Sequence, residues 1–279
     1  CGRGCEYGYN LTELLVASEG TLALTSKAVF KLVTPPKASK AMMAIFPEVK
    51  RASQAVAGII AAHVVPCTLE FMDNATINYV EDYVNIGLPR DAAAILLIEV
   101  DGHPAQVADE AVSVEKVLKD SGALEVVVAK DAAEKTRIWE ARRVAIPALA
   151  RCRPTLMLED ATVPRSKIPA MLEALDRIAA RHHVTIGTFG HAGDGNLHPS
   201  ILCDKRDKEE FSRVERAVDD LFNMALELGG TLSGEHGIGT AKKKWLELET
   251  SKGTLGYMRR MRSAFDPKKL LNASKIVSL

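Results

Sequence analysis

The sequence predicts an α+β fold, in which ferredoxin-like repeated α/β units form one mostly antiparallel sheet with helices packed on it, followed by C-terminal helices. Between residues 40 and 205, short apolar runs alternate with amphipathic segments, which is typical of a single sheet covered by helices. The turn-linked segments are of similar length, which indicates two related halves. With 279 residues, of which 47% are hydrophobic and 26% charged, the chain can bury a substantial core.

The individual elements follow from apolar periodicity and from turn residues. Residues 1–34 are Gly-rich and then strand-like, and the Pro-Pro-Lys sequence at 35–37 marks a boundary. The predicted strands are 41–46, 66–73, 92–102, 124–129, 155–164 and two short strands within 184–203. The predicted helices are 47–63, 75–84, 104–121, 131–151, 166–183, 207–228 and two closing helices that end near residue 265.

The composition narrows the class of protein. Lys+Arg and Asp+Glu both number 36, so the net charge is zero, and no nucleic-acid-binding pattern is present. No apolar run reaches the roughly 18 residues that a membrane-spanning helix needs. The five cysteines are odd in number and scattered, which favours reduced thiols in a cytoplasmic protein over a metal framework. The first residues, CGRGCEYGYNLTELL, match no signal peptide, and we expect the chain to begin inside a larger protein.

Residues 189–199, FGHAGDGNLHP, predict a β-hairpin that carries two histidines. Asp-Gly is a strong signal for a two-residue turn, because Gly and Asp tolerate a positive φ. With Asp194 and Gly195 as the turn, His191 pairs directly with His198. Directly paired side chains lie on the same face with Cβ atoms about 5 Å apart, so the two imidazoles could reach one metal ion.

A second loop, GEHGIG at 234–239, supplies Glu235 and His236. Two imidazoles, one carboxylate and an open position are typical of a catalytic divalent metal, which polarises a substrate oxygen. His236 could instead act as a general base, since imidazole titrates near neutral pH. The spacing equally fits two ordinary turns, with His191 and His198 as a cross-strand pair on a polar face. At this point both interpretations stay open.

GHAGDGNLHP followed by GEHGIG resembles the C-terminal domain of the FAD-linked oxidases of D-2-hydroxy acids, which include the glycolate oxidase large subunit, D-lactate dehydrogenases and D-2-hydroxyglutarate dehydrogenase. The resemblance extends over most of the chain. ELLVASEGTLALTSKAVFKL is similar to the segment that ends the family's FAD-binding domain, and IWEARR, LEDATVP and FDPKKLLNASKI match further family segments.

This resemblance implies a division of the chain into three parts. Residues 1–36 would be the C-terminal remnant of a PCMH-type FAD-binding domain, and 37–230 a substrate or cap domain. Residues 231–279 would form an active-site loop and C-terminal helices that return to the flavin. Because most of the FAD-binding domain would precede the chain, we expect the fragment alone to bind FAD poorly, and residues 1–34 to be flexible or rearranged.

The resemblance also implies roles for residues in the two loops. It makes His191, His198 and Glu235 ligands of a divalent metal, most often zinc, and His236 the catalytic base beside the flavin. Asn196 becomes a polar contact to the substrate.

Other residues outside these loops also match family positions. Arg142 matches the family arginine that holds the substrate carboxylate, a task that suits a planar guanidinium. Without the resemblance, a solvated arginine beside Arg143 would be the better interpretation. The residues that match the FAD contacts are Ser18, Gly20, Thr21 and Asn272.

The sequence departs from the family pattern in three places. Ala23 stands where a glycine is usual, and Ala273-Ser274 replace the usual Pro-Gly after Asn272. Leu158 stands where members acting on a longer diacid have a lysine, which argues for a short monocarboxylate such as lactate or glycolate. Asp160 is retained.

The implied activity is the oxidation of a small D-2-hydroxy acid to the 2-oxo acid, with FAD and a divalent metal as cofactors. Electrons would leave through an iron–sulfur subunit, an electron-transfer flavoprotein or a quinone. The expected location is cytoplasmic or at the membrane periphery, and a homodimer stays open. Three alternatives remain: a flavin oxidase of phenolic alcohols on the same fold, a metal-dependent hydrolase, and a non-catalytic cap or scaffold.

Overall fold

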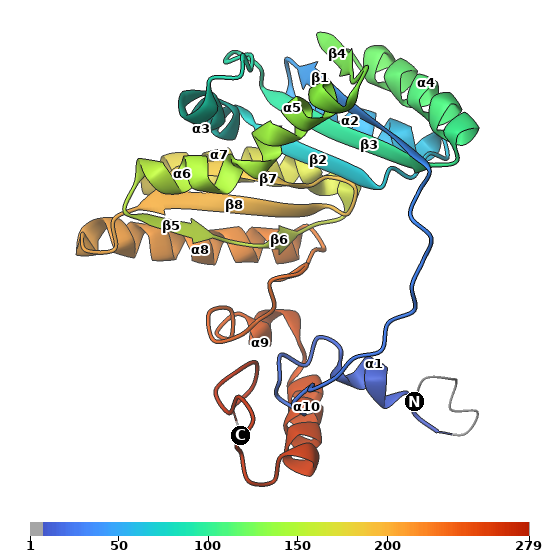
Figure 1. Ribbon diagram of the computed structural model, residues 1–279. Coiled ribbons are helices and arrows are strands. Elements are labelled where there is room, and N and C mark those ends of the chain that lie inside the picture. Colours follow the sequence, from blue (N-terminus) through green and yellow to red (C-terminus); the bar gives the residue numbers. More distant parts are fainter. Residues whose placement is uncertain (1–7, 279) are drawn as a thin grey trace. The chain divides into compact units, whose positions relative to one another are not determined.

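The computed structural model describes residues 8–278, which fall into two compact units (Figure 1). The larger unit, called the sheet unit, is Pro35–Thr231. The terminal unit combines residues 8–34 with residues 232–278. Cys1, Cys5 and most of the Gly-rich start of the chain lie outside the described residues. No helix within residues 8–278 is long and apolar enough to cross a membrane.

The sheet unit is built on one eight-stranded sheet in which every pairing is antiparallel, as the sequence predicts. The strand order is β4-β1-β3-β2-β7-β8-β5, and β6 pairs with the free part of β8. The strands are β1 (Ala38–Phe46), β2 (Thr68–Asp73), β3 (Ala94–Gly102), β4 (Glu125–Val128), β5 (Thr155–Leu158), β6 (Ala161–Thr162), β7 (Thr185–His191) and β8 (Asn196–Cys203).

The strand order confirms the two predicted ferredoxin-like halves. In the first half, β1, β2, β3 and β4 take the order 4-1-3-2, which is the order of a βαββαβ unit. The second half repeats the 1-3-2 part of this order as β5, β8 and β7. The two halves join where β2 pairs with β7.

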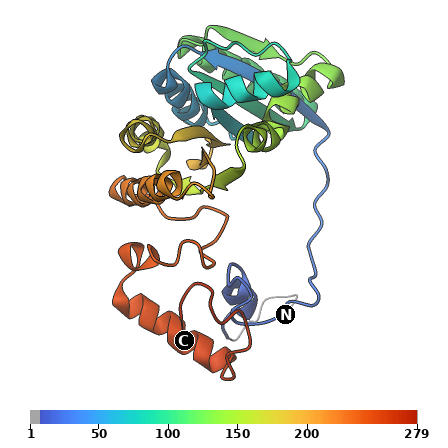
Figure 2. The same ribbon diagram turned by 90° about the vertical axis from the view of Figure 1, so that its left-hand side faces the viewer.

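Helices cover both faces of the sheet (Figures 1 and 2). One face carries α2 (Val49–Ala61), α4 (Pro104–Asp120), α7 (Ile168–His182), which follows the 3-10 turn Arg165–Lys167, and α8 (Lys208–Glu227). The other face carries α3 (Asn74–Val84), α5 (Ala132–Arg143) and α6 (Ala145–Cys152). A large apolar cluster fills the space between this second helical layer and the sheet.

Two predicted elements are split by prolines. The predicted helix 131–151 is two helices, because Pro147 has no N–H to donate to the Arg143 carbonyl, and its ring would collide with that group. The predicted strand 155–164 is also two strands, β5 and β6. There Glu159 donates to the Pro199 carbonyl oxygen at 2.9 Å, but Pro199 cannot return the hydrogen bond.

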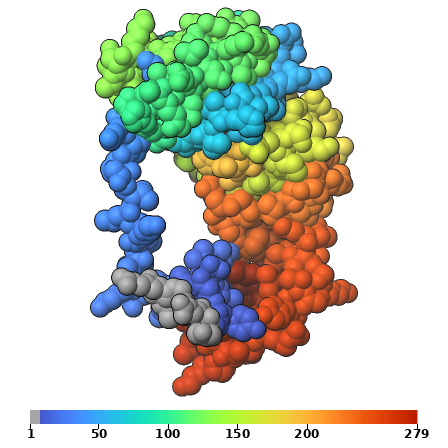
Figure 3. All heavy atoms as spheres, turned by 90° about the vertical axis from the view of Figure 1, so that its right-hand side faces the viewer, coloured from blue at the N-terminus to red at the C-terminus, as the bar shows by residue number. Residues whose placement is uncertain are grey.

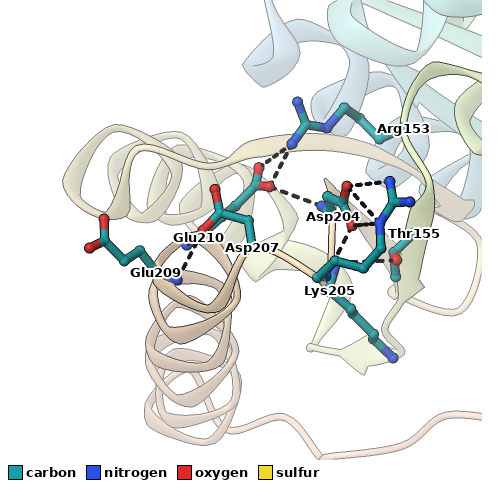
Figure 4. Close-up of polar contacts among 8 residues, drawn as sticks. Arg153, Thr155, Asp204, Lys205, Asp207, Glu209 and Glu210 are labelled. Atoms are coloured by element: carbon teal, nitrogen blue, oxygen red, sulfur yellow. Dashed lines mark hydrogen bonds and ion pairs between the residues drawn. The ribbon is translucent and has the colours of Figure 1, made fainter.

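Charged side chains fix the start of α8 (Figure 4). Asp207 caps the helix by accepting hydrogen bonds from the backbone N–H groups of Glu209 and Glu210. The Glu210 carboxylate in turn accepts from the Asp204 backbone N–H at 2.9 Å and from the guanidinium of Arg153, just before β5. These contacts tie the beginning of α8 to the outer edge of the sheet.

The terminal unit contains little regular structure. Its helices are α1 (Leu11–Leu15), α9 (Leu246–Glu249) and α10 (Lys252–Phe265). The prediction that the chain before Pro35 is strand-like is wrong for residues 8–34, because a strand needs a hydrogen-bonding neighbour and the described residues supply none. Residues 23–36 form neither helix nor strand, and their large apolar side chains are exposed (Figure 3). These side chains are Leu24, Val29, Phe30, Leu32 and Val33.

A single buried arginine organises the C-terminal segment of this unit. The Arg262 guanidinium, on α10, donates hydrogen bonds to the carbonyl oxygens of Leu271, Asn272, Lys275 and Val277. Arg262 is only 2% exposed. The Arg262 side chain therefore ties together four carbonyl groups of the irregular chain after α10.

Candidate functional site

The β7–β8 hairpin places both histidines on one face of the sheet, but in a different register from the one predicted. His191 pairs with Asn196, and Phe189 pairs with His198. The loop has four residues, 192–195, so the predicted Asp-Gly turn with direct His191–His198 pairing is wrong. The register differs by two residues, and a shift of two keeps every side chain on its own face. The two histidines are therefore diagonal neighbours.

The loop has this shape because only one of its residues takes a left-handed conformation. The backbone N–H groups of Asp194 and Gly195 both donate to the His191 carbonyl oxygen, at 3.1 and 3.0 Å. Gly195 has a φ of 78°, whereas a two-residue turn of the predicted type needs positive φ at Asp194 as well. A Cβ on Gly195 would overlap the Val163 carbonyl oxygen, so the position requires glycine.

The two imidazoles lie close enough to serve one metal ion. Their ring centroids are 5.1 Å apart, and the rings are almost perpendicular, with an interplanar angle of 89°. His198 is buried, and the His191 side chain is 32% exposed. This pair supplies two of the nitrogen ligands that zinc commonly uses.

Glu70, which the sequence did not single out, connects two of the predicted site residues. It lies on β2 directly opposite His191 in the β2–β7 pairing. One carboxylate oxygen lies 2.6 Å from His191 Nδ1, and the other accepts a hydrogen bond from Arg142 Nε at 2.7 Å. Burial acts to raise the pKa of Glu70, but the His191 hydrogen bond and the Arg142 charge outweigh it, so the pKa is lowered. The sequence held one signal for this residue: a glutamate lies inside the apolar strand TLEFMD, and glutamate is rarely buried unless it is paired.

Arg142 reaches this face from the last turn of α5. Its guanidinium carbon lies 4.6 Å above the centre of the Phe189 ring, and its side chain is 18% exposed. The helix is held on the sheet by Glu99, which accepts hydrogen bonds from Lys135 Nζ at 2.6 Å and from Trp139 Nε1 at 2.7 Å. The predicted carboxylate-binding arginine is thus brought next to His191 through Glu70.

Asn196 completes this part of the site. It is 5% exposed and stands opposite His191 on the same face. Its side-chain oxygen accepts a hydrogen bond from the Thr162 hydroxyl on β6, at 3.0 Å. The Thr of the LEDATVP segment therefore orients Asn196.

A cavity of about 250 Å³ borders Glu70 and His191 within the sheet unit. Its walls come from the end of α2, the start of β2, the β7–β8 loop and the turn after β6. The polar lining residues are Cys67, Thr68, Glu70, Arg165, His191 and Asp194. This side of the site is thus a concave, polar surface.

The predicted flavin-contacting residues come together in the terminal unit, although about 250 positions separate them in the sequence. Asn272 Nδ2 donates to the Glu19 carbonyl oxygen at 2.7 Å. It lies against Gly20, where a Cβ would come within 2.8 Å of Nδ2. Thr21 closes the turn by donating to the Ser18 carbonyl oxygen from its N–H at 2.9 Å and from its hydroxyl at 2.6 Å.

The second loop belongs to the same unit and is held by Glu19. Both carboxylate oxygens of Glu19 accept backbone hydrogen bonds, from Ile238 and from Gly239, each at 2.7 Å. Glu235 and His236 are exposed in this loop. The histidine pair lies in the other unit, so the joining of Glu235 and His236 with that pair stays a prediction.

Comparison with known proteins identifies the family. A family model described as "FAD linked oxidases, C-terminal domain" matches residues 35–276. The chain is 46% identical over 269 residues to glycolate oxidase subunit GlcD of Bacillus subtilis (strain 168), covering 96% of this chain and 57% of that protein. It is 37% identical over 268 residues to GlcD of Escherichia coli (strain K12), covering 96% and 54%. It is 31% identical over 274 residues to a probable mitochondrial D-lactate dehydrogenase of Danio rerio, covering 98% and 55%. The chain thus spans little more than half the length of these relatives.

Solved structures share the fold at low identity. p-Cresol methylhydroxylase with substrate bound superposes with a TM-score of 0.72 at 13% identity, covering 98% of this chain and 59% of that chain. Alkyldihydroxyacetonephosphate synthase superposes with a TM-score of 0.65 at 16% identity, covering 95% and 50%. From the family match, the identity to the relatives and the repeated antiparallel sheet, the chain belongs to the family of FAD linked oxidases, C-terminal domain.

Proposed function

We propose that this chain is the C-terminal part of an FAD-dependent dehydrogenase that oxidises a small D-2-hydroxy acid, of the lactate or glycolate type, to the 2-oxo acid. The observation that carries the proposal is the joining of Arg142 and His191 by Glu70 on one face of the sheet. The names of the relatives, glycolate oxidase subunit and D-lactate dehydrogenase, point to the same substrate class.

In this proposal Arg142 binds the substrate carboxylate. The Phe189 ring below the guanidinium and the Glu70 carboxylate beside it hold this side chain in place. A fixed, planar guanidinium fixes the orientation of a bound carboxylate and thereby of the neighbouring carbon. Leu158 on β5 packs into the apolar cluster and offers no second cation, which favours a monocarboxylate.

His191 and His198, joined by Glu235, would hold a divalent metal, zinc being our first choice. The donor chemistry fits, because two imidazoles lie side by side and one of them has a carboxylate partner on its other ring nitrogen. A divalent metal, when bound, supplies a Lewis acid that polarises the substrate hydroxyl.

His236 would accept the hydroxyl proton on a ring nitrogen, and Asn196 would hydrogen-bond the substrate. FAD, when bound, supplies the acceptor for the two electrons. Ser18, Gly20, Thr21 and Asn272 would border it, since their turn combines an amide with closely approaching backbone. The relatives' designation as subunits supports a partner that takes the electrons onward, such as an iron–sulfur subunit or an electron-transfer flavoprotein.

The test is anaerobic reduction of the flavin in the full-length protein by D-lactate and by glycolate, followed by steady-state kinetics of Arg142→Met. We expect the variant to lose about 100-fold in kcat/KM, equal to about 2.7 kcal/mol, because a charge-assisted contact to the substrate is gone. Arg143→Met is the matched control, since Arg143 is exposed on the same helix and, within residues 8–278, donates only to backbone carbonyls of that helix. A flavin that neither acid reduces, or equal losses in both variants, would refute the proposal.

The metal site has its own measurement. Protein purified without chelators should contain about one divalent ion per chain, and His198→Ala should remove most of it. A His198→Ala protein with unchanged metal content and turnover would exclude the metal site. Reduction of the flavin by 4-alkylphenols in place of hydroxy acids would instead support a phenol oxidase.

A further inference from the structure

Glu70 is a buried carboxylate with both oxygens in use, and each oxygen serves a different element. Its side chain is 6% exposed. Oε1 lies 2.6 Å from His191 Nδ1 on β7, and Oε2 accepts from Arg142 Nε on α5. The three side chains come from segments 49 to 121 residues apart in the sequence. Three successive residue pairs between β2 and β7 fix the Glu70–His191 opposition.

The contact to His191 sets which ring nitrogen carries a proton. A carboxylate in a salt bridge with a guanidinium is ionised, and an ionised carboxylate can only accept hydrogen bonds. Its partner Nδ1 must therefore be the protonated nitrogen, which leaves the ligating lone pair on Nε2. In metal sites, a carboxylate on the far nitrogen of a histidine selects the tautomer and orients the ring.

The contact to Arg142 determines which guanidinium nitrogen atoms remain to bind an anion. Among the described residues, Arg142 makes its one hydrogen bond through Nε. A guanidinium can bind a carboxylate in bidentate fashion from its side, through Nε and one Nη, or from its end, through both Nη atoms. With Nε bonded to Glu70, only the end-on mode keeps two hydrogen bonds.

We propose that Glu70 is a positioning residue: through one oxygen it holds His191 in the tautomer that can ligate a divalent metal, and through the other it turns Arg142 to receive a carboxylate end-on. This role rests on the proposed function. One carboxylate thus sets the spacing between the group that faces the substrate hydroxyl and the group that binds the substrate carboxylate. In a 2-hydroxy acid these two substrate groups stand on adjacent carbons.

Glu70→Gln tests the role with little change of shape. An amide has one accepting oxygen and one donating nitrogen, so the substituted side chain is not able to accept from both partners. The Arg142 Nε–H can only donate, whereas a neutral imidazole can change tautomer, so the amide turns its oxygen to Arg142 and its nitrogen to His191. Nδ1 of His191 must then accept, and the proton moves to Nε2. We use zinc alone as the probe and expect its affinity to fall by about 10- to 100-fold.

The matched control is Glu99→Gln. Glu99 also accepts from two side chains of α5, Lys135 and Trp139, but it touches neither His191 nor Arg142. It therefore reports any general effect of loosening α5 on the sheet. We expect its zinc affinity to equal that of the wild type. Glu70→Asp, which keeps the charge and shortens the reach by one methylene, serves as a second variant if Glu70→Gln does not fold, and should weaken zinc binding.

A second readout needs no metal and no substrate. In the metal-free full-length protein labelled with ¹⁵N-histidine, long-range proton–nitrogen spectra should show His191 protonated at Nδ1. Glu70→Gln should shift this pattern, and Glu99→Gln should not. The proposal is overturned if Glu70→Gln keeps both the tautomer and the zinc affinity of the wild type. A wild type that binds no zinc is a different result: it overturns the metal site in the proposed function, and this role with it.

Discussion

The glycine at the tip of the β7–β8 hairpin offers a sharp test of the site's framework. Gly195 adopts a φ of 78°, and its backbone runs so close to β6 that a Cβ would overlap the Val163 carbonyl oxygen. Gly195 also accepts a hydrogen bond from the Val163 N–H at 3.0 Å. We therefore expect Gly195→Ala to destabilise the protein.

Two costs add up in this variant. An alanine in the left-handed region costs about 1–2 kcal/mol, part of which is offset by the lower entropy of the unfolded chain. Relief of the overlap requires the loop to move away from β6, which breaks the hydrogen bond to Val163 at a cost of about 1–2 kcal/mol for the buried groups left behind. We expect a total loss of about 3 kcal/mol in the free energy of unfolding.

Gly87→Ala is the matched control. Gly87 has nearly the same backbone angle, a φ of 82°, but a Cβ there would meet no atom within 4 Å. It should lose only about 1 kcal/mol. Urea unfolding followed by the fluorescence of Trp139, which lies in the sheet unit, measures both variants. Equal losses in the two variants would refute the proposed close approach of the hairpin to β6.

Three further predictions concern charged groups. Burial raises the pKa of Asp73 to about 6, so the native state holds this proton more tightly than the unfolded chain does. The free energy of unfolding should therefore fall by about 3 kcal/mol as the pH rises from about 4 to about 6. Urea titrations should find this decline in the wild type but not in Asp73→Asn, and parallel pH curves would contradict it. Glu19→Ala removes the acceptor of the Ile238 and Gly239 amides, whose hydrogen exchange should accelerate about tenfold or more; unchanged rates would mean that another group holds the loop. Arg262→Met removes the guanidinium that donates to four carbonyls and should make the segment after residue 265 protease-sensitive, whereas an unchanged digest would count against the role of this arginine.

Elements with strong local signals could be predicted closely from the sequence. The helix that begins with Pro104 was expected over 104–121 and spans Pro104–Asp120, because proline favours the first helical position and the apolar spacing is regular. The helix expected over 131–151 broke because Pro147 acts on a carbonyl four residues earlier, a rule that outweighs helical periodicity. The Asp-Gly signal located the hairpin but gave the wrong loop length, since Gly195 alone takes a positive φ.

The site could be predicted only in part. The two histidines were expected on one face, and they lie there because strand periodicity survives a register shift of two residues. Glu70 was missed because its partners are 72 and 121 residues away and no short motif joins them. Glu19 was missed for the same reason, since the loop that it holds lies more than 200 residues downstream.

The β2–β7 pairing joins the two halves of the sheet and also carries part of the candidate site. It is a short seam of three residue pairs between two similar halves, and Glu70 and His191 face each other across it. Neither half could assemble this contact alone. A ligand that contacts residues of both halves stabilises their association, because the free energy of its binding adds to that of the strand pairing. Ligand binding and the pairing of β2 with β7 are therefore linked equilibria. Loss of the ligand should weaken the β2–β7 pairing before the other pairings of the sheet.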